Sequence, residues 1–182
     1  QNNFGHCLHG GPKGWQYQVY EANLIDPTTL ELTLISPDGD ANFPGNVTAK
    51  VTYQLTDDNA IDICYNAETD HTSVGNLTNH SYFNLGGQDT VLDHLLMINA
   101  RQITPVDHEL IAHGDFMEID GTPYSFLPAK KIGQDAFSDA EPIKQCGGYD
   151  FNYCLDRVGK GLVRVAYVYD EASGRKMDCY TT

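Results

Sequence analysis

Alternation of apolar and polar residues recurs along the chain, which is the pattern of β-strands with one buried face. Residues 47–55 and 61–65 alternate in this way on either side of a short turn rich in Asp and Asn. We expect these two runs to form a β-hairpin, because Asp and Asn favour turn conformations. Residues 163–169 and 176–180 flank a second polar, glycine-containing segment and predict another hairpin.

The other strand-like runs are short and are separated by turn residues. They are residues 15–20, 30–34, 92–100, 102–106 and 151–155. Helical periodicity never persists beyond about two turns, and only residues 107–112 and 131–137 could form a turn of helix. Many short strands with Gly, Pro and Asp turns predict an all-β fold, an antiparallel β-sandwich. We expect residues 1–182 to form a single β-sandwich domain, since a chain of this length can bury a substantial core.

Net charge limits the classes of partner. The chain has 11 basic and 25 acidic residues, for a formal charge of −14. Such a balance disfavours nucleic acid, anionic lipid and phosphorylated substrates, and it favours a neutral ligand. The acid excess is equally explained by a contribution to solubility. No apolar run approaches the roughly 20 residues of a membrane-spanning helix, so we expect no membrane partner.

Cysteine usage indicates the compartment. The five cysteines are scattered, and no C-x-x-C pair occurs. We therefore expect reduced, mostly buried thiols in a cytoplasmic protein, with neither a disulfide framework nor a zinc site. The chain opens on Gln1 without a basic and then apolar leader, which also favours the cytoplasm. Two N-x-T sequons, at residues 46–48 and 76–78, point weakly the other way.

Two histidine-bearing stretches are the most informative features of the sequence. They are L-H-G-G at residues 8–11 and N-L-T-N-H-S-Y-F-N-L-G-G at residues 76–87. Asn79 and Ser81 flank His80, so local hydrogen bonds can orient its ring while the other nitrogen remains available for proton transfer. We expect His80 to lie in a strand. The simpler alternatives are a half-buried strand histidine at position 80 and a turn residue at His9.

Together the two stretches resemble the aldose 1-epimerase (galactose mutarotase) family, whose members carry N-x-L-H-G-G and N-L-T-N-H-S-Y-F-N-L in this order. Residues 121–126, G-T-P-Y-S-F, resemble the family signature G-T-P-F-D-F, and residues 147–155 resemble G-x-D-x-x-(F/Y)-x-L. The resemblance extends from Leu8 to Thr182 and implies the large antiparallel sandwich of galactose mutarotases. Family members are longer at both ends. We therefore expect the chain to be the central portion of a longer mutarotase domain, incomplete at both ends.

The resemblance also implies roles for individual residues. It makes His80 the general acid and His9 a hydrogen-bond donor to the sugar near the reacting oxygen. It makes Asp150 a ligand of sugar hydroxyls, although an Asp that follows Gly-Gly is often only a turn residue. From chemistry alone, Tyr82 could stack on the apolar face of a sugar, as could Trp15.

The reaction implied is the interconversion of α and β anomers of free aldoses such as galactose or glucose. A proton leaves the anomeric hydroxyl and another reaches the ring oxygen, so one acid and one base suffice, without cofactor or metal. The family base is a Glu from a late strand. Glu141 and Glu171 do not match that segment, so a non-catalytic carbohydrate-binding module of the same fold stays open.

Two further alternatives rank lower. A hexose-6-phosphate epimerase needs cationic groups for phosphate, and this chain has few. A purely structural protein leaves the two histidine stretches unexplained. The family signature usually continues with a basic residue where this chain has Leu127, which leaves the preferred sugar open. Phe83 could also stack on the apolar face of a sugar, but we expect it to pack in the core.

Overall fold

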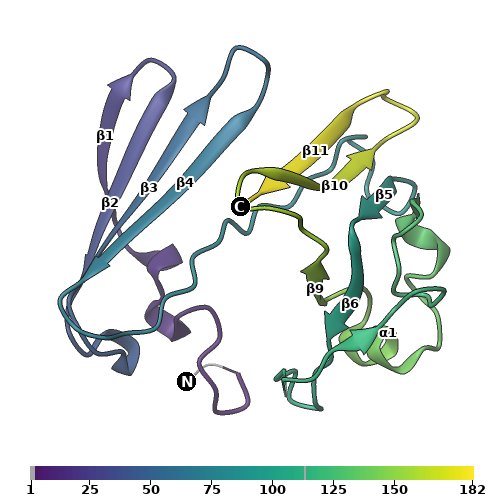
Figure 1. Cartoon of the computed structure of the whole chain (residues 1–182), viewed down its shortest axis with the longest axis horizontal. Coiled ribbons are helices and arrows are strands. Elements are labelled where there is room, and N and C mark those ends of the chain that lie inside the picture. The colour runs from purple at the N-terminus through teal and green to yellow at the C-terminus, as the bar shows by residue number, and fades with distance from the viewer. Residues whose placement is uncertain (1–2, 113) are drawn as a thin grey trace. The chain divides into compact units, whose positions relative to one another are not determined.

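The computed structural model describes residues 3–112 and 114–182 (Figure 1). The chain divides into two compact units, Gln1–His80 and Ser81–Thr182. Strands dominate both units, and the strand pairings are antiparallel. The prediction of an antiparallel all-β fold is therefore confirmed.

The first unit contains a four-stranded sheet in the order β1-β2-β3-β4. Its strands are β1 (Glu21–Asp26), β2 (Thr29–Ser36), β3 (Val47–Leu55) and β4 (Ile61–Thr69). The predicted hairpin is present, because β3 pairs with β4 from Val47↔Thr69 to Leu55↔Ile61. The predicted strand at residues 30–34 is the centre of β2.

Strand register gives this sheet one apolar and one polar face. Leu32, Val51 and Tyr65 lie side by side across β2, β3 and β4. Because side chains alternate along a strand, the neighbouring polar positions face the other way. Leu34 and Ala49 are buried on the apolar face, whereas Leu24 on β1 is 67% exposed. The apolar face is thus well covered over only part of its length.

Residues 15–20 do not form the predicted strand. Two 3₁₀ helices, η1 (Gly11–Lys13) and η2 (Trp15–Tyr17), occupy this region, and a third, η3 (Asp40–Asn42), follows β2. The backbone N–H of Tyr17 donates to the carbonyl oxygen of Gly14 at 2.9 Å. This turn closes on itself, so the alternation in residues 15–20 cannot extend into a sheet ladder.

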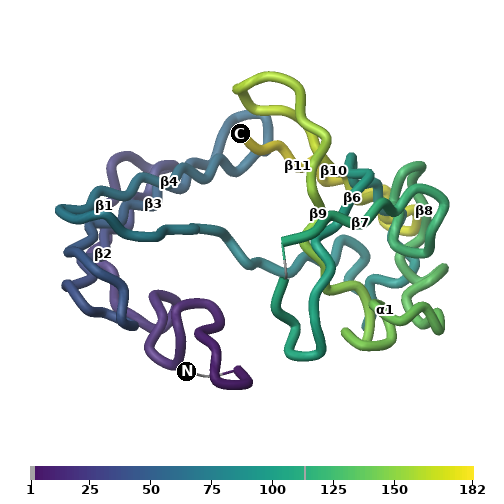
Figure 2. Tube along the Cα trace, turned by 60° about the horizontal axis from the view of Figure 1, so that its bottom comes forward, coloured from purple at the N-terminus to yellow at the C-terminus, as the bar shows by residue number. Residues whose placement is uncertain are grey.

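The prediction that His80 lies in a strand is also wrong. After β4, residues 72–80 run as an extended trace without ladder hydrogen bonds (Figure 2). His80 is therefore presented from a connecting segment rather than from a sheet.

The second unit contains two small sheets, in the orders β11-β10-β5-β8 and β7-β6-β9. Their strands are β5 (Leu95–Ile98), β6 (Ala100–Thr104), β7 (Met117–Glu118), β8 (Lys130–Lys131), β9 (Asn152–Leu155), β10 (Val163–Tyr169) and β11 (Lys176–Thr181). The second predicted hairpin is confirmed by the pairing of β10 with β11. The predicted strands at residues 92–100, 102–106 and 151–155 correspond to β5, β6 and β9, with shorter or shifted bounds.

A buried cluster forms the core of the second unit. It consists of Ile103, Ile119, Tyr124 and Ile143, against which Met117, Tyr149, Phe151 and Tyr153 pack. Ile143 comes from the helix α1 (Glu141–Cys146), which Gly147 ends in a left-handed conformation. Six residues are too few for a helical period to show in the sequence, so α1 was not predicted. The expected turn of helix at residues 131–137 is present as the 3₁₀ helix η4 (Ile132–Gln134).

The cysteines differ in exposure from what the sequence predicted. All five cysteines are free, but Cys7, Cys64 and Cys179 are exposed, so the expectation of mostly buried thiols is wrong.

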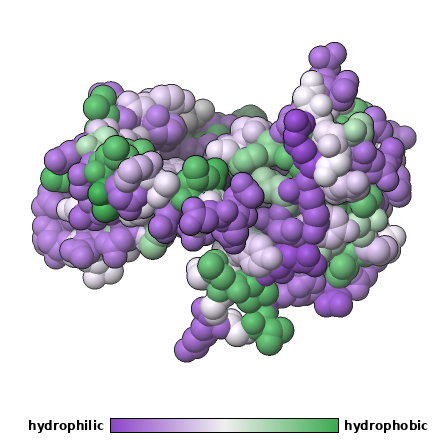
Figure 3. Space-filling model, turned by 90° about the horizontal axis from the view of Figure 1, so that it is seen from above, coloured by the Kyte–Doolittle hydropathy of each residue, from purple (hydrophilic) through white to green (hydrophobic). Residues whose placement is uncertain are grey.

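Hydrophilic residues predominate on the face seen in Figure 3, and apolar residues form separate patches on it. Within the described residues, no helix has the length and apolar character needed to cross a membrane.

Candidate functional site

The two predicted histidines meet in the first unit. The ring centroids of His9 and His80 are 5.4 Å apart, with an interplanar angle of 77°. This is an edge-to-face contact between rings from distant parts of the sequence. Both residues are exposed, so their rings remain accessible from solvent. The structure thus brings together the two histidines that the motifs had singled out.

A left-handed turn presents His9. Its φ is 51°, and Gly10 and Gly11 follow with φ of 81° and 80°. Glycine adopts such angles readily, whereas a non-glycine residue there is strained by about 1–2 kcal/mol. Gly14 is needed for a different reason: a Cβ built there would lie 2.4 Å from the carbonyl oxygen of His9. The loop can therefore close on His9 only because position 14 has no side chain.

A tyrosine of the sheet anchors the residue before His80. Nδ2 of Asn79 donates a hydrogen bond to the hydroxyl oxygen of Tyr53 on β3, at 3.2 Å. Burial, and secondly proximity to Tyr53, raise the pKa values of Tyr20 and Tyr65. Sequence reasoning missed Tyr53, since its place in the alternation of β3 suggested only core packing.

A carboxylate fixes the start of the segment that leads to His80. Asp70 accepts hydrogen bonds from the backbone N–H of Asn46 at 2.8 Å and from its Nδ2 at 2.7 Å. Nδ1 of His71 lies 2.8 Å from the same carboxylate. The bonds from Asn46 and His71 lower the pKa of Asp70 to about 2, and Asp70 in turn raises the pKa of His71. The end of β4 is thereby tied to the loop before β3.

Asp150 lies in the second unit, between Gly148 and the start of β9. The φ of Gly148 is 146°, a conformation that L side chains rarely adopt. The residue Asp150 is exposed. Its neighbour Phe151 packs edge-to-face on Tyr124, with ring centroids 5.6 Å apart. A packed main chain thus presents an exposed carboxylate.

Two tyrosine hydroxyls join the two remaining family-like segments. Tyr149 donates to the carbonyl oxygen of Pro123, and Tyr153 donates to that of Tyr124, each at 2.9 Å. Burial, and secondly the charge of Asp135, raise the pKa of Tyr149 to about 12. Burial also raises the pKa of Tyr153 well above its usual range. We call this arrangement, Tyr149 and Tyr153 on the carbonyls of Pro123 and Tyr124, the tyrosine latch.

The aromatic residues after His80 are on the surface. Tyr82 is 90% exposed, so solvent reaches most of its side chain. Phe83 is also largely exposed, so the prediction that it packs in the core is wrong. Trp15 is half-buried in η2 of the first unit.

A buried histidine holds the end of the second motif. The backbone N–H of Leu85 donates to Nε2 of His94 at 2.9 Å, and the carbonyl oxygen of Leu85 accepts from Arg175 at the same distance. Since Nε2 accepts, the ring proton of His94 belongs on Nδ1. His94 is 2% exposed. Gly86 packs against Asp170, where a Cβ would lie 3.1 Å from a carboxylate oxygen. Sequence reasoning missed His94, which has no flanking motif.

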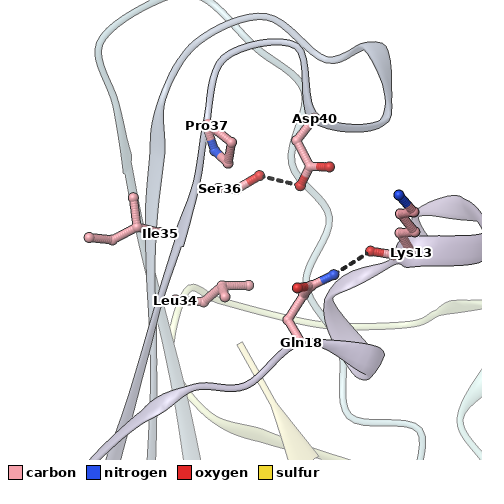
Figure 4. A pocket seen from close by; sticks show the side chains of 7 residues that line it. All are labelled: Lys13, Gln18, Leu34, Ile35, Ser36, Pro37 and Asp40. Carbon is pink, nitrogen blue, oxygen red and sulfur yellow. Dashed lines mark hydrogen bonds between the residues drawn. The ribbon is translucent and has the colours of Figure 1, made fainter.

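Two shallow pockets lie beside the His9 loop in the first unit. One, of about 220 Å³, is shown in Figure 4 and is lined by Lys13, Gln18, Leu34, Ile35, Ser36, Pro37 and Asp40. The other, of about 210 Å³, is lined by Cys7, Gly10, Gly11, Pro12, Lys13, Asp40, Ala41 and Asn42. Neither includes His9 or His80, so we place the candidate site by its histidines. Among the described residues, no group of three or more His, Cys, Asp or Glu could hold a metal ion.

Comparison with known proteins identifies the family. The family model for aldose 1-epimerase matches residues 1–182. The chain belongs to the aldose 1-epimerase family. It is 38% identical over 176 residues to the aldose 1-epimerase of Escherichia coli K12, covering 96% of this chain and 51% of that protein. It is 34% identical over 183 residues to the galactose mutarotase of Sus scrofa, covering 100% of this chain and 51% of that protein.

Solved structures agree with the sequence relatives. The GalM/aldose epimerase homologue from C. elegans has a TM-score of 0.85 at 28% identity, covering 97% of this chain and 53% of that one. Galactose 1-epimerase from Lactobacillus acidophilus has a TM-score of 0.83 at 30% identity, covering 93% of this chain and 50% of that one. The predicted mutarotase-type β-sandwich fold is confirmed. The chain spans about half the length of the curated relatives it matches.

Proposed function

We propose that the protein interconverts the α and β anomers of free aldoses such as galactose or glucose. The observation that carries this proposal is the contact between the exposed rings of His9 and His80. Membership of the aldose 1-epimerase family supports the same reaction class. An isomerase of this kind needs groups that exchange protons with the sugar, and two accessible imidazoles are such groups.

We assign the proton transfers as follows. His80 donates a proton to the ring oxygen of the sugar as the bond between C1 and the ring oxygen opens. The anomeric hydroxyl gives its proton to a base, for which we assign no residue of this chain, and both transfers reverse on closure. His9 donates a hydrogen bond near the ring oxygen and stabilises the charge that develops there. The freed aldehyde rotates about the C1–C2 bond and closes in either configuration. This chemistry is acid–base only and requires no cofactor.

Asp150 and Tyr82 are the substrate-binding groups of the proposal. The two oxygens of the Asp150 carboxylate can each accept a hydrogen bond from one of two neighbouring hydroxyls. The ring of Tyr82 can stack on the apolar face of a sugar, and its exposure supports that role. A neutral monosaccharide also fits a chain with a formal charge of −14.

A binding-only module of the same fold is the second candidate. The family uses a glutamate as the base, and no glutamate of this chain matches that segment. Glu141 begins α1, and Glu171 lies in the turn between β10 and β11. The two functions predict the same sugar affinity but different rates, so kinetics separates them.

We further propose that both units are parts of one mutarotase domain within a longer polypeptide, and that this polypeptide is cytoplasmic. The match of a single family model to residues 1–182 supports the first statement. The five free thiols support the second. An intact-mass measurement of the purified protein tests the first, since a mass equal to the 20.1 kDa of this chain would contradict it.

Polarimetry on fresh α-D-galactose tests the catalytic proposal. In the active protein, we expect His80→Asn to lower the rate by about 10²–10⁴-fold, the usual contribution of a general acid. Folding should be nearly unchanged, because the residue is exposed. His108→Asn is the matched control, since His108 is an exposed histidine outside both motifs. Equal rates for the two variants would contradict the role of His80.

Galactose titration tests the binding-only alternative and the role of Asp150. Binding without any rate above that of buffer would favour the module over the enzyme. In either case we expect Asp150→Ala to weaken galactose binding by roughly ten- to a hundredfold, because two charge-assisted hydrogen bonds are lost. An unaltered affinity would remove Asp150 from the site.

A further inference from the structure

Lys130 is a largely buried cation that contacts Tyr149, the residue before Asp150. Its side chain is only 12% exposed. Nζ donates to Asp135 at 2.7 Å and to the carbonyl oxygen of Pro123 at 2.6 Å. It also lies 5.0 Å from the ring centroid of Phe126. Lysine is rarely this buried unless it is paired, so these partners define a built site for the ammonium group.

The ammonium of Lys130 and the hydroxyl of Tyr149 share one acceptor. Both donate to the carbonyl oxygen of Pro123, Tyr149 at 2.9 Å. Nζ also lies 5.8 Å from the ring centroid of Tyr149, within the range of a cation–π interaction. The ring of Tyr149 lies 4.8 Å from that of Phe126. Lys130 thus contacts both the ring of Tyr149 and the group to which its hydroxyl is bonded.

Tyr149 directly precedes Asp150. None of the hydrogen bonds found among the described residues holds the Asp150 carboxylate itself. Its position therefore depends on its main chain, which is fixed by Tyr149 on one side and Phe151 on the other. Phe151 packs on Tyr124. Tyr149 packs on Phe126, and its hydroxyl and ring also meet the carbonyl oxygen of Pro123 and the ammonium of Lys130.

We propose that Lys130, with its counter-ion Asp135, is a positioning residue for Asp150. By holding Tyr149, it places the Asp150 carboxylate where two hydroxyls of a sugar can reach it. This inference rests on the proposed role of Asp150 in sugar binding.

Lys130→Met tests the proposal, with Lys131→Met as the matched control. Methionine keeps most of the aliphatic stem and removes the charge. Lys131 is the adjacent residue, but its Nζ pairs at 3.3 Å with Asp93, and the two side chains are 50% and 90% exposed. The first measurement is the NMR amide shifts and hydrogen exchange of residues 149–151, without sugar. We expect both to change in K130M and to stay at wild-type values in K131M. Identical behaviour of the two variants would overturn the proposal.

The second measurement is galactose affinity. We expect K130M to weaken binding about tenfold, as for the loss of one charge-assisted interaction, and K131M to leave it unchanged. In a protein that already carries D150A, K130M should cause no further loss, because Lys130 acts through Asp150. Additive losses would show that it acts elsewhere and would overturn the proposal.

Absence of galactose binding and misfolding of K130M can each be distinguished from failure of this proposal. A wild-type protein that does not bind galactose would refute the proposed function, while the amide measurements would still decide whether Lys130 positions Asp150. If K130M does not fold, Y149F replaces it, since it removes only the hydroxyl bond to Pro123. We expect Y149F to move the amide shift of Asp150, and an unmoved shift would overturn the proposal.

Discussion

The two units hold their candidate residues by different means. In the second unit, Asp150 follows a main chain packed on a buried core of aliphatic and aromatic side chains. In the first unit, His9 and His80 are held by a left-handed turn, a glycine contact and single hydrogen bonds beside a partly exposed sheet. Packing spreads the positioning of one residue over many contacts, whereas hydrogen bonds concentrate it in few. Substitutions should therefore act through stability in the second unit and through local geometry in the first.

The largest effect is expected in the core of the second unit. Phe126 is 1% exposed, so Phe126→Ala should lower the free energy of unfolding by about 3–5 kcal/mol. Leu24 in the first unit is 67% exposed, so Leu24→Ala should change it by less than about 0.5 kcal/mol. Urea denaturation measures both. Similar losses would mean that the exposed face of the first sheet is covered in solution.

Substitution of Gly14 is the most direct test of local geometry in the first unit. A Cβ would lie 2.4 Å from the carbonyl oxygen of His9, so Gly14→Ala should cost about 1–3 kcal/mol and displace His9. A Cβ at Gly75 meets nothing within 4 Å, which makes Gly75→Ala the control. We expect mutarotation to fall with Gly14→Ala and to persist with Gly75→Ala. Equal activity of the two variants would show that the function of His9 does not depend on the Gly14 contact.

A smaller effect is expected at Tyr53. Tyr53→Phe removes the hydroxyl that accepts the hydrogen bond from Asn79 and should cost about 1 kcal/mol. The activity loss should exceed that of Tyr65→Phe, because Tyr65 lies on the same face without this bond to Asn79. Thermal unfolding and polarimetry of both variants would show whether the segment before His80 depends on β3.

The smallest effect is expected when alkaline pH ionises the tyrosine latch. The pKa of Tyr149 is raised from 10.0 to about 12 in the folded protein. Its contribution to stability is therefore full below pH 10 and is lost as the pH rises through 12. Denaturation of the wild type and of Tyr149→Phe across this window should converge at its upper end. A constant difference would mean that the phenol does not ionise with unfolding.

Alternation of apolar and polar residues predicted most of the sheet residues, because turn-forming residues such as Gly, Pro and Asp mark the ends of the alternating runs. The β3–β4 and β10–β11 hairpins were predicted on this basis. The same signal failed for residues 15–20, where glycines close 3₁₀ turns. The strand expected at His80 is also absent, because the extended segment before it has no partner strand. Alternation could not reveal α1, although Pro142 near the start of that helix and Gly147 at its end were usable signals.

For the candidate site, the motifs identified residues but not their supports. The candidates His9, His80, Tyr82 and Asp150 were proposed from the sequence, and the structure brings the first two together. Tyr53, His94 and Lys130 were missed, because each contacts a group that lies outside its own stretch of sequence. A motif records residues that are adjacent in the chain, so it carries little information about such partners.

The tyrosine latch binds its loop through main-chain oxygens rather than through side chains. Every residue carries a carbonyl group, so the loop can exchange its side chains without losing the acceptors. This gives a physical reason why the segment G-T-P-Y-S-F can depart from G-T-P-F-D-F and still hold Tyr149 and Tyr153. In related sequences, variation should therefore concentrate at loop positions that contribute only an oxygen, while the two phenols that reach them stay unchanged.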